Sequence, residues 1–332
     1  MAVDAGRMGR VPDLCVLGLG LIGGSVLRAA TAAGWTAWGA TKSAEDAEAA
    51  GADGFDVSTD LNAALDRAAA VDALVVVAVP LPAVDEVLRR VAILAPTAKL
   101  TDVVSVKGPV DDAVRRLVPD ARYVGGHPMA GTSTSGWAAS TAKLFEDAAW
   151  VVAVEDGSDP AVLREVVELA LASGAHVVPA GAAEHDSAVG RISHLPHVLA
   201  AVLAAVGADG GPLAMALAAG SFADGTRVAG TRPELVRAMC EGNRSALLDA
   251  VDDALGRLGA ARGSLASTGG LAKTIDAGHA GRKALDAQRA AERTEVTIDL
   301  GSPGAPEALR ALGARGGRIV WLRGTTAGAQ TS

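Results

Sequence analysis

Aromatic side chains, cysteine and positive charge are all scarce in this 332-residue sequence. Aromatic residues make up 3% of the chain, and the formal net charge is -8. Nucleic-acid-binding proteins use basic surface to neutralise phosphates, so the acidic balance argues against a nucleic-acid partner. Only two cysteines occur, Cys15 and Cys240, and they lie far apart in the sequence. This spacing argues against a disulfide framework and favours a reducing compartment, the cytoplasm.

Long apolar segments are also missing. The first residues carry scattered charges and no apolar core of signal-peptide length, so we expect no export. The least charged stretch, residues 192–208, is slightly too short to span a bilayer and is interrupted by His194, Pro196 and His197. We therefore predict a buried helix there and no association with a membrane.

Half of the residues are hydrophobic, which is enough for the cores of two ordinary domains. The first half of the chain alternates short Val-rich runs with Ala-rich amphipathic stretches, a pattern typical of parallel strands and crossover helices. We predict an α/β fold: a Rossmann-type, doubly wound, large and mostly parallel sheet within residues 1–180. The strand-like runs are residues 14–17, 36–39, 73–79, 99–104, 123–125, 149–154 and 176–178.

The strand signals stop near Gly181, and Ala- and Leu-rich helical stretches follow. Residues 181–290 are therefore predicted to form an all-helical domain. Its stretches are more uniformly apolar than a solvated helix face, so we expect part of it to be buried in a homodimer. Residues 291–332 are predicted to form a small appended strand-helix-strand tail, to which we assign no role.

A glycine turn follows the first strand and opens the first helix, and it reads Gly18-Leu19-Gly20-Leu21-Ile22-Gly23. In this setting the glycines permit a tight turn and close approach of the backbone to a pyrophosphate. The helix N-terminus then presents its free N–H groups to the phosphates. Although any strand-turn-helix can use glycines, we predict a dinucleotide site formed by Gly18, Gly20, Leu21, Ile22 and Gly23, with Val79 at the end of a neighbouring strand.

The second strand ends in Thr41-Lys42-Ser43, where NAD-dependent enzymes usually carry an acidic residue for the ribose hydroxyls. Two hydroxyls and an ammonium suit a 2′-phosphate. We therefore predict NADP or NAD as the cofactor, with a slight preference for NADP. The alternative interpretation is an ordinary exposed loop with one solvated lysine.

Polar clusters follow the later strands. Residues 102–107 lie at the carboxyl edge of the predicted sheet, where doubly wound folds bind ligands. His127 stands between glycines and a proline, which indicates a fixed loop of the kind that often serves function. Residues 184–186 and 193–197 contain three of the six histidines, and His185 is expected to be a hydrogen-bonded core residue rather than a catalytic one. Arg227 follows a polar loop and suits a carboxylate. We find no spacing that indicates a metal site.

In order and spacing, these clusters resemble the prephenate/arogenate dehydrogenase family. The motifs are GLGLIGGS, VSVKGP, GGHPMAGT, EHD with SHLPH, and DGTR, and the similarity spans residues 13 to 285. The resemblance implies a Rossmann domain joined to a helical dimerisation domain, with the active site between them. It also implies oxidative decarboxylation of prephenate to 4-hydroxyphenylpyruvate in tyrosine biosynthesis, or of arogenate directly to tyrosine.

The resemblance also implies a role for each site residue. His127 would take the proton of the ring hydroxyl while hydride leaves, and Ser105 would orient that hydroxyl. Arg227 would bind the ring carboxylate, and Asp186 would hold Arg227 in place. His197 and the loop at Thr132 would face the side-chain end of the substrate or the nicotinamide.

The sequence departs from the family pattern at Val104, Ser133 and Val236. A carboxylate at position 133 would favour the ammonium group of arogenate, and its absence favours prephenate. Other reductases of this architecture, such as β-hydroxyacid dehydrogenases and pyrroline-carboxylate reductases, lack the HPMAGT and SHLPH motifs. A non-catalytic dinucleotide sensor is a further alternative, which would leave the polar cleft residues without a purpose.

Overall fold

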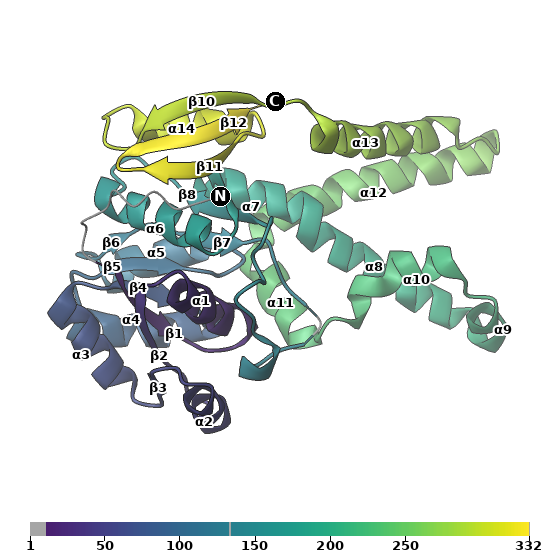
Figure 1. Cartoon of the computed structure of the whole chain (residues 1–332). Coiled ribbons are helices and arrows are strands. Elements are labelled where there is room, and N and C mark those ends of the chain that lie inside the picture. Colours follow the sequence, from purple (N-terminus) through teal and green to yellow (C-terminus); the bar gives the residue numbers. More distant parts are fainter. Residues whose placement is uncertain (1–10, 133, 332) are drawn as a thin grey trace.

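A fully parallel six-stranded sheet forms the first half of the molecule in the computed structural model, which describes residues 11–132 and 134–331 (Figure 1). The strand order is β3-β2-β1-β4-β5-β6, so the order reverses between β1 and β4. Ligands of doubly wound sheets bind at such a reversal, beyond the carboxyl ends of the strands. The strands are β1 (Asp13–Leu17), β2 (Thr36–Ala40), β3 (Val57–Ser58), β4 (Leu74–Val77), β5 (Lys99–Asp102) and β6 (Arg122–Tyr123).

Amphipathic helices cover both faces of this sheet and bury its apolar strands. In α4, Val84, Val87, Leu88 and Val91 recur at helical spacing and are all buried. Apolar side chains on the two faces form two separate clusters. The helices are α1 (Leu21–Ala32), α2 (Ala44–Ala52), α3 (Leu61–Val71), α4 (Leu81–Leu94) and α5 (Gly108–Leu117). The predicted Rossmann-type fold class is therefore confirmed.

The prediction of one large, mostly parallel sheet is wrong, because the chain enters a second six-stranded sheet after β6. This sheet has the order β10-β12-β11-β9-β8-β7, and only β8 and β9, joined through α6 (Pro160–Ala172), are parallel. At the entry, a Cβ on Gly126 would lie 2.7 Å from the carbonyl oxygen of Asp102. The strands are β7 (Gly126–Pro128), β8 (Ala149–Ala153), β9 (His176–Ala180), β10 (Thr294–Asp299), β11 (Arg318–Arg323) and β12 (Thr326–Thr331).

The C-terminal tail is an integral part of this second sheet. Strand β11 pairs with β9 through Ile319 and Val177, and α14 (Ala305–Ala314) packs against β9. The strand-helix-strand prediction omitted β12, which follows β11 after a turn containing Gly324. The sequence of β12, TAGAQT, is rich in small residues that rarely favour strands, so no strand pattern is visible there.

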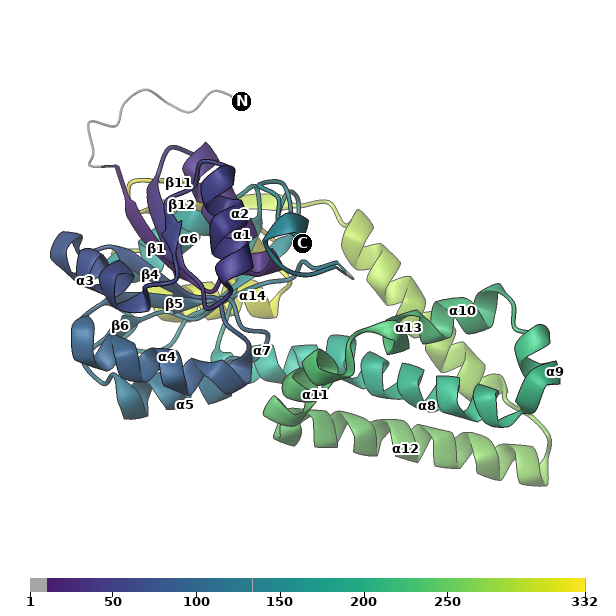
Figure 2. The ribbon, with the colours of Figure 1, turned by 90° about the horizontal axis from the view of Figure 1, so that it is seen from below.

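Residues 182–290 form helices only, as the sequence predicts, although the domain boundaries at 180 and 290 remain predictions. Figures 1 and 2 show two long helical arms, residues 195–226 and residues 244–290, that project from the α/β part of the molecule. The elements are α7 (Ala182–Val189), η2 (Gly190–His194), α8 (Leu195–Asp209), α9 (Gly211–Ala216), α10 (Gly220–Thr226), η3 (Arg227–Gly230), α11 (Pro233–Gly242), α12 (Arg244–Ser267) and α13 (Ala272–Ala290). A short 3-10 helix, η1 (Trp137–Ala139), lies in the loop after β7.

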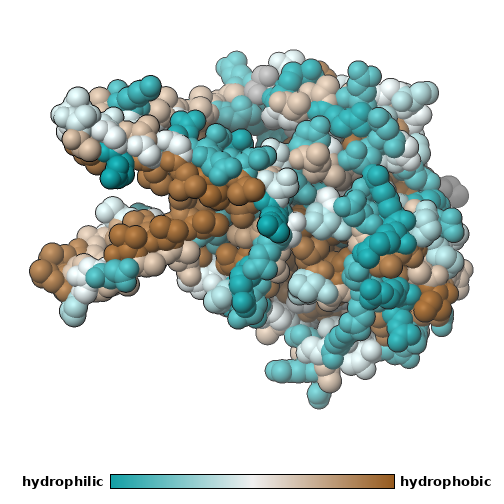
Figure 3. All heavy atoms as spheres, turned by 180° about the vertical axis from the view of Figure 1, so that it is seen from behind, coloured by the Kyte–Doolittle hydropathy of each residue, from teal (hydrophilic) through white to brown (hydrophobic). Residues whose placement is uncertain are grey.

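The helical arms expose apolar side chains. The predicted buried helix at residues 192–208 is wrong for the single chain, because Val202 and Val206 of α8 are 55% and 64% exposed. Figure 3 shows apolar side chains facing the notch between the arms. Among the described residues, the continuous helical stretch Ala182–Asp209 is also long and apolar enough to cross a membrane, by length and composition alone.

Candidate active site

The glycine turn forms a close-fitting cradle at the carboxyl end of β1. Gly18 has a φ of +100°, and a Cβ there would lie 2.6 Å from the carbonyl oxygen of Ala78 and 2.8 Å from Cγ1 of Val79. A Cβ on Gly23 would lie 1.9 Å from the carbonyl oxygen of Gly18. Only glycine fits these two positions. Gly20, by contrast, has open space at its Cβ position within the described structure.

The N-terminus of α1 opens into this cradle without a protein cap. The described residues give Gly20, its N-cap, no side-chain hydrogen bond and place no acidic residue in the first turn. The first backbone N–H groups of the helix, including those of Leu21 and Ile22, are therefore available to a phosphate. The cradle and the open helix end together fit the pyrophosphate of a dinucleotide.

The predicted ribose-side residues already have partners. Lys42 forms an exposed ion pair with Glu86 of α4, with 2.7 Å between Nζ and the carboxylate. Ser43 caps α2, since its hydroxyl accepts from the backbone N–H of Asp46. The Thr41 hydroxyl accepts a long hydrogen bond, 3.4 Å, from the N–H of Ser43. A 2′-phosphate would have to compete with Glu86 for Lys42.

A buried charged network lies beneath the loop between β5 and α5. The Lys107 ammonium is buried, and it donates to the Asp102 carboxylate and to the carbonyl oxygen of Gly126, the latter at 2.6 Å. The Tyr123 hydroxyl donates to the same carboxylate at 2.6 Å. Burial lowers the pKa of Lys107, against the opposing effect of Asp102. Ser105 lies partly buried in this loop.

The sequence interpretation assigned no role to Lys107 or Asp102. One signal was available: Lys107 follows the run VVSV, and a lysine among valines after a buried strand is unusual for a solvated charge. Because Lys107 binds the carbonyl of the residue before His127, the network fixes the backbone that carries this histidine.

His127 lies on the short strand β7, and not in a loop as predicted, because Gly126–Pro128 pairs with β8. Its Nδ1 is 2.8 Å from Nε2 of His185, and the two rings meet edge to face. Nδ1 of His185 is in turn 2.8 Å from Oδ1 of Asp186. Burial, followed by the charges of His185, Lys107 and His194, holds the pKa of His127 well below 6.5. His127 is therefore a neutral base at pH 7.

No described contact joins Asp186 to Arg227 within the chain, so the role of holding that arginine stays a prediction. The Asp186 carboxylate accepts hydrogen bonds from the backbone N–H groups of Lys107 and Gly108, each at 2.8 Å, and from His185. It therefore ties α7 to the start of α5. Burial raises its pKa, but the hydrogen bonds outweigh burial and leave the pKa below the usual value.

His194 and His197 continue the polar cluster along η2 and α8. Asn243 lies 3.1 Å from Nδ1 of His194 through its side-chain amide, which also donates to the carbonyl oxygen of Asp186 at 2.7 Å. Burial lowers the pKa of His194 to about 4. Burial also lowers the pKa of His197, and the nearby charge of Arg227 adds to this effect. Arg227 itself is exposed at the start of η3.

Thr132 lies in an exposed loop, where its hydroxyl is 2.9 Å from that of Thr134. No described contact joins Thr132 to His197. Ser133, at the position where the family often has an acidic residue, lies outside the described residues. Farther along, Trp137 anchors the loop to α2: its backbone N–H donates to Asp46.

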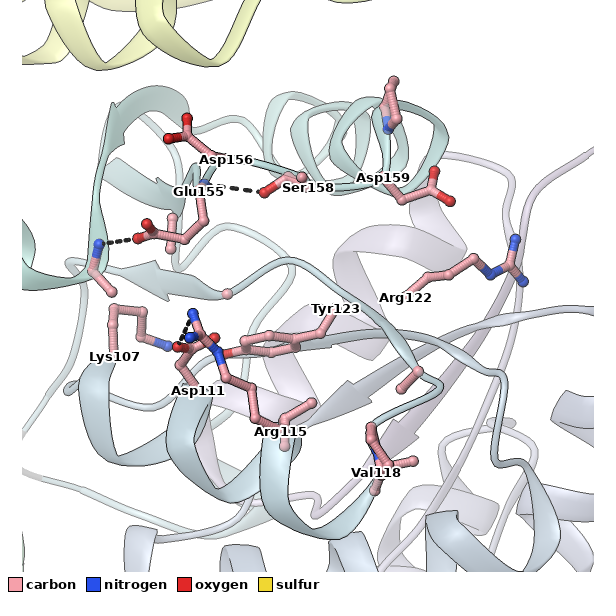
Figure 4. A pocket seen from close by; sticks show the side chains of 18 residues that line it. Lys107, Asp111, Arg115, Val118, Arg122, Tyr123, Glu155, Asp156, Ser158 and Asp159 are labelled. Carbon is pink, nitrogen blue, oxygen red and sulfur yellow. Dashed lines mark hydrogen bonds and ion pairs between the residues drawn. The ribbon is translucent and has the colours of Figure 1, made fainter.

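A cavity of about 730 Å³ lies between α5 and the loop before α6, and Lys107 is one of the residues that line it (Figure 4). Neither His127 nor the glycine cradle lines it. Its prominent charges have protein partners: Arg115 pairs with Asp111, Arg122 pairs with Asp72, and Glu155 accepts from the N–H of Ala182. We therefore place the candidate active site at His127 and the glycine turn, and not in this cavity.

Comparison with known proteins agrees with this arrangement. Residues 28–179 match the nucleotide-binding domain model of prephenate dehydrogenase, and residues 181–268 match its dimerisation domain model. A Zymomonas mobilis cyclohexadienyl dehydrogenase is 32% identical over 77% of this chain and 89% of its own length. The chain belongs to the prephenate/arogenate dehydrogenase family.

Two solved structures share most of the architecture of this chain. A Corynebacterium glutamicum structure described as a prephenate dehydrogenase is 46% identical, with a TM-score of 0.88 over 92% of this chain and 98% of that one. Synechocystis arogenate dehydrogenase is 29% identical, with a TM-score of 0.69 over 82% of this chain and 99% of that one. The matched segments span only 43% and 60% of the lengths of two other curated prephenate dehydrogenases.

The family models include the polar cluster but not every predicted residue. Ser105 and His127 fall in the first match, and Asp186, His197 and Arg227 fall in the second. The glycine turn precedes the first match, which begins at residue 28. The assignment of the cofactor cradle therefore depends on the geometry of Gly18, Gly20 and Gly23.

Proposed function

We propose that this protein is a prephenate dehydrogenase of tyrosine biosynthesis, which oxidatively decarboxylates prephenate to 4-hydroxyphenylpyruvate. The observation that carries the proposal is the neutral, partly buried His127 imidazole at the sheet edge, held by His185. Family membership supports the same reaction.

The cofactor in this proposal is NADP or NAD, with a slight preference for NADP. Gly18, Gly20, Leu21, Ile22 and Gly23 would hold the pyrophosphate, as their cradle and the open end of α1 suggest. Val79 would border it, and residues 41–43 would meet the adenosine ribose. A nicotinamide dinucleotide bound there supplies the hydride acceptor. A nicotinamide complex of a distant relative supports a cofactor of this class.

Prephenate carries a hydroxyl and a hydrogen on one ring carbon and a carboxylate across the ring. His127 takes the hydroxyl proton as the C–H bond electrons leave as hydride, and Ser105 orients the hydroxyl. The C–C bond to the carboxylate then breaks, carbon dioxide leaves, and its electrons restore aromaticity. Arg227 binds that carboxylate, and His197 beside it, with the loop at Thr132, faces the rest of the substrate.

A spectrophotometric assay of nicotinamide reduction tests this proposal, using prephenate and arogenate, each with NAD and NADP. We expect turnover with prephenate, a decrease in kcat of about 10²-fold or more for His127→Asn, and mainly a raised KM for Arg227→Ala. Cofactor binding without turnover on either substrate would instead indicate a dinucleotide sensor. An Asn variant with normal kcat would remove His127 from the mechanism.

Arogenate is the second candidate substrate, because the Synechocystis relative is an arogenate dehydrogenase. Arogenate carries an ammonium group where prephenate has a keto group. Ser133 offers no carboxylate for that ammonium, which is why we favour prephenate. The ratio of kcat/KM for the two substrates in the same assay decides between them.

We also propose a cytoplasmic homodimer that forms through the helical arms, with neither a membrane nor nucleic acid as a partner. The matched dimerisation model supports this, and so do exposed apolar side chains such as Val206 and Leu255. Both cysteines are free thiols, which suits a reducing compartment. A second copy would bury the same side chains that make Ala182–Asp209 look like a membrane span.

A further inference from the structure

We propose that His185, oriented by Asp186, is a positioning residue that fixes the proton of the His127 imidazole on Nδ1 and leaves Nε2 free as the catalytic base. This inference rests on the proposed function and deepens it. It also reverses the sequence-based expectation that His185 serves only the core.

Both carboxylate oxygens of Asp186 lie within hydrogen-bond distance of donors. Its Oδ1 accepts from the Lys107 N–H and lies 2.8 Å from Nδ1 of His185, while its Oδ2 accepts from the Gly108 N–H. Three hydrogen bonds keep this side chain ionised, in agreement with its lowered pKa. A carboxylate only accepts hydrogen bonds, so Nδ1 of His185 must carry a hydrogen.

The contact between His127 and His185 fixes which ring nitrogen of His127 carries the hydrogen. A neutral imidazole carries one N–H, so a His185 protonated on Nδ1 has a lone pair on Nε2. The 2.8 Å contact then requires His127 to donate from Nδ1. This leaves a lone pair on Nε2 of His127. The opposite tautomer would need a His185 imidazolium and would leave His127 unable to accept a proton from the substrate at Nε2.

The proposed reaction places a positive charge on His127. When the hydroxyl O–H bond breaks, a new N–H bond forms on Nε2, and His127 becomes an imidazolium. Its Nδ1–H still donates to His185, and the His185 Nδ1–H still donates to the Asp186 carboxylate. No second proton moves. The negative charge of Asp186, fixed by the α5 backbone, stabilises the imidazolium across two hydrogen bonds.

The charged and titratable groups that face this pair come from three elements. Lys107 approaches from the loop between β5 and α5, Asp186 from α7, and His194 from η2. Lys107, already paired with Asp102, and His194 oppose the imidazolium. The negative charge of Asp186 favours it through the hydrogen bond to His185. Asp186 is therefore the group that offsets the cost of charging His127 in this buried position.

Nitrogen-15 NMR of histidine-labelled wild-type protein at pH 7 tests the tautomer directly, and it requires no substrate. The His127→Asn variant identifies the His127 signals. We expect one-bond coupling to hydrogen at Nδ1 of His127 and none at Nε2. Coupling at Nε2 instead would overturn the proposal. Because this result does not depend on turnover, it stands apart from the test of the proposed function.

Kinetics of two variants test the consequence for catalysis. His185→Phe keeps the ring volume but removes the acceptor, and we expect kcat to fall by about 10²-fold with KM changed by less than about threefold. His185→Gln offers an amide oxygen near the position of Nε2 and should restore about tenfold of that loss. His176→Gln, on β9, is the matched control and should retain wild-type kinetics.

Unchanged dinucleotide binding and thermal unfolding would establish that the His185 variants are folded. If the Phe variant is folded and keeps kcat within twofold of wild type, the positioning role is wrong. If the Phe variant does not fold, the NMR experiment still decides. If wild-type protein turns over neither prephenate nor arogenate, the proposed function fails while the tautomer assignment remains.

Discussion

The two halves of this molecule place their side chains in opposite ways. The α/β part buries charged groups, including Lys107 and Asp102, and its apolar clusters draw on both its sheets and the C-terminal tail. The helical arms expose large apolar residues along α8 and α12 and bury few side chains of their own. The α/β part is therefore complete within one chain, whereas the arms need a second surface to cover them.

The candidate active site lies where these two halves meet. His127 and Lys107 come from the α/β part, while His185, Asp186 and His194 come from the helical segment that is buried against it. The start of the helical region therefore belongs structurally to the candidate active site, and only its distal helices would be covered by the second copy that we propose.

The largest expected effect is on the folded state of the α/β half. Lys107→Met would leave the Asp102 carboxylate buried without its cation and the Gly126 carbonyl without its donor. Breaking a buried ion pair in this way costs about 3–5 kcal/mol. We expect a corresponding decrease in the free energy of unfolding, measured by urea titration.

Lys42→Met is the matched control, because Lys42 forms an exposed pair with Glu86 that solvent screens, and its loss should leave the free energy of unfolding nearly unchanged. Equal losses in the two variants would mean that burial does not distinguish these two lysines, and that the buried network contributes little to the stability of the α/β part.

The second largest expected effect is on the proposed dimer that forms through the helical arms. Val206→Glu places a charge on the exposed apolar face of α8, where the proposed dimer would bury it. We expect the dimer to weaken by about 2 kcal/mol or more, seen as monomer at micromolar concentration in analytical ultracentrifugation. Ile93→Glu, on the equally exposed surface of α4, is the control and should leave the dimer intact. A wild-type monomer would contradict the idea that the arms are incomplete alone.

Local sequence patterns predicted much of the first half of this fold. The glycine turn, the Val-rich strands and the amphipathic helices each depend on neighbouring residues, so their chemistry is visible in a short window. The division into two sheets is not local, because it depends on which distant strands pair. His127 pairs with Val151, and Ile319 pairs with Val177. No periodicity in the sequence reports such choices.

The site was predicted unevenly for the same reason. The sequence motifs identify His127, Ser105 and His197 as candidate site residues. The hydrogen-bond partners of buried polar groups, by contrast, are set by tertiary packing. Asp186 was expected to hold Arg227, and within the chain it holds the N–H groups at the start of α5. His185 was expected to be structural, and the structure places it between Asp186 and His127.

A smaller effect concerns the pH dependence of stability. His194 is buried, with a folded-state pKa of about 4, whereas an unfolded histidine titrates near 6.5. Between these values the unfolded chain binds more protons, so stability is full above pH 6.5 and falls as pH decreases toward 4. We expect Tm to be lower at pH 5 than at pH 7.5. His194→Gln should reduce that difference, and an unchanged difference would exclude His194 as a cause.

The smallest effect concerns cofactor choice at the edge of the α/β half. Glu86 pairs with Lys42, the cation best suited to a 2′-phosphate, and solvent screens this exposed pair, so it is weak. Glu86→Gln frees Lys42 and removes a negative charge from the same edge. We therefore expect KM for NADP to fall by about threefold while KM for NAD changes little, measured by initial rates with prephenate. Lys42→Met should raise KM for NADP only. Equal shifts for both cofactors in both variants would mean that this pair lies outside the ribose site, and that the preference for NADP has no basis in residues 41–43.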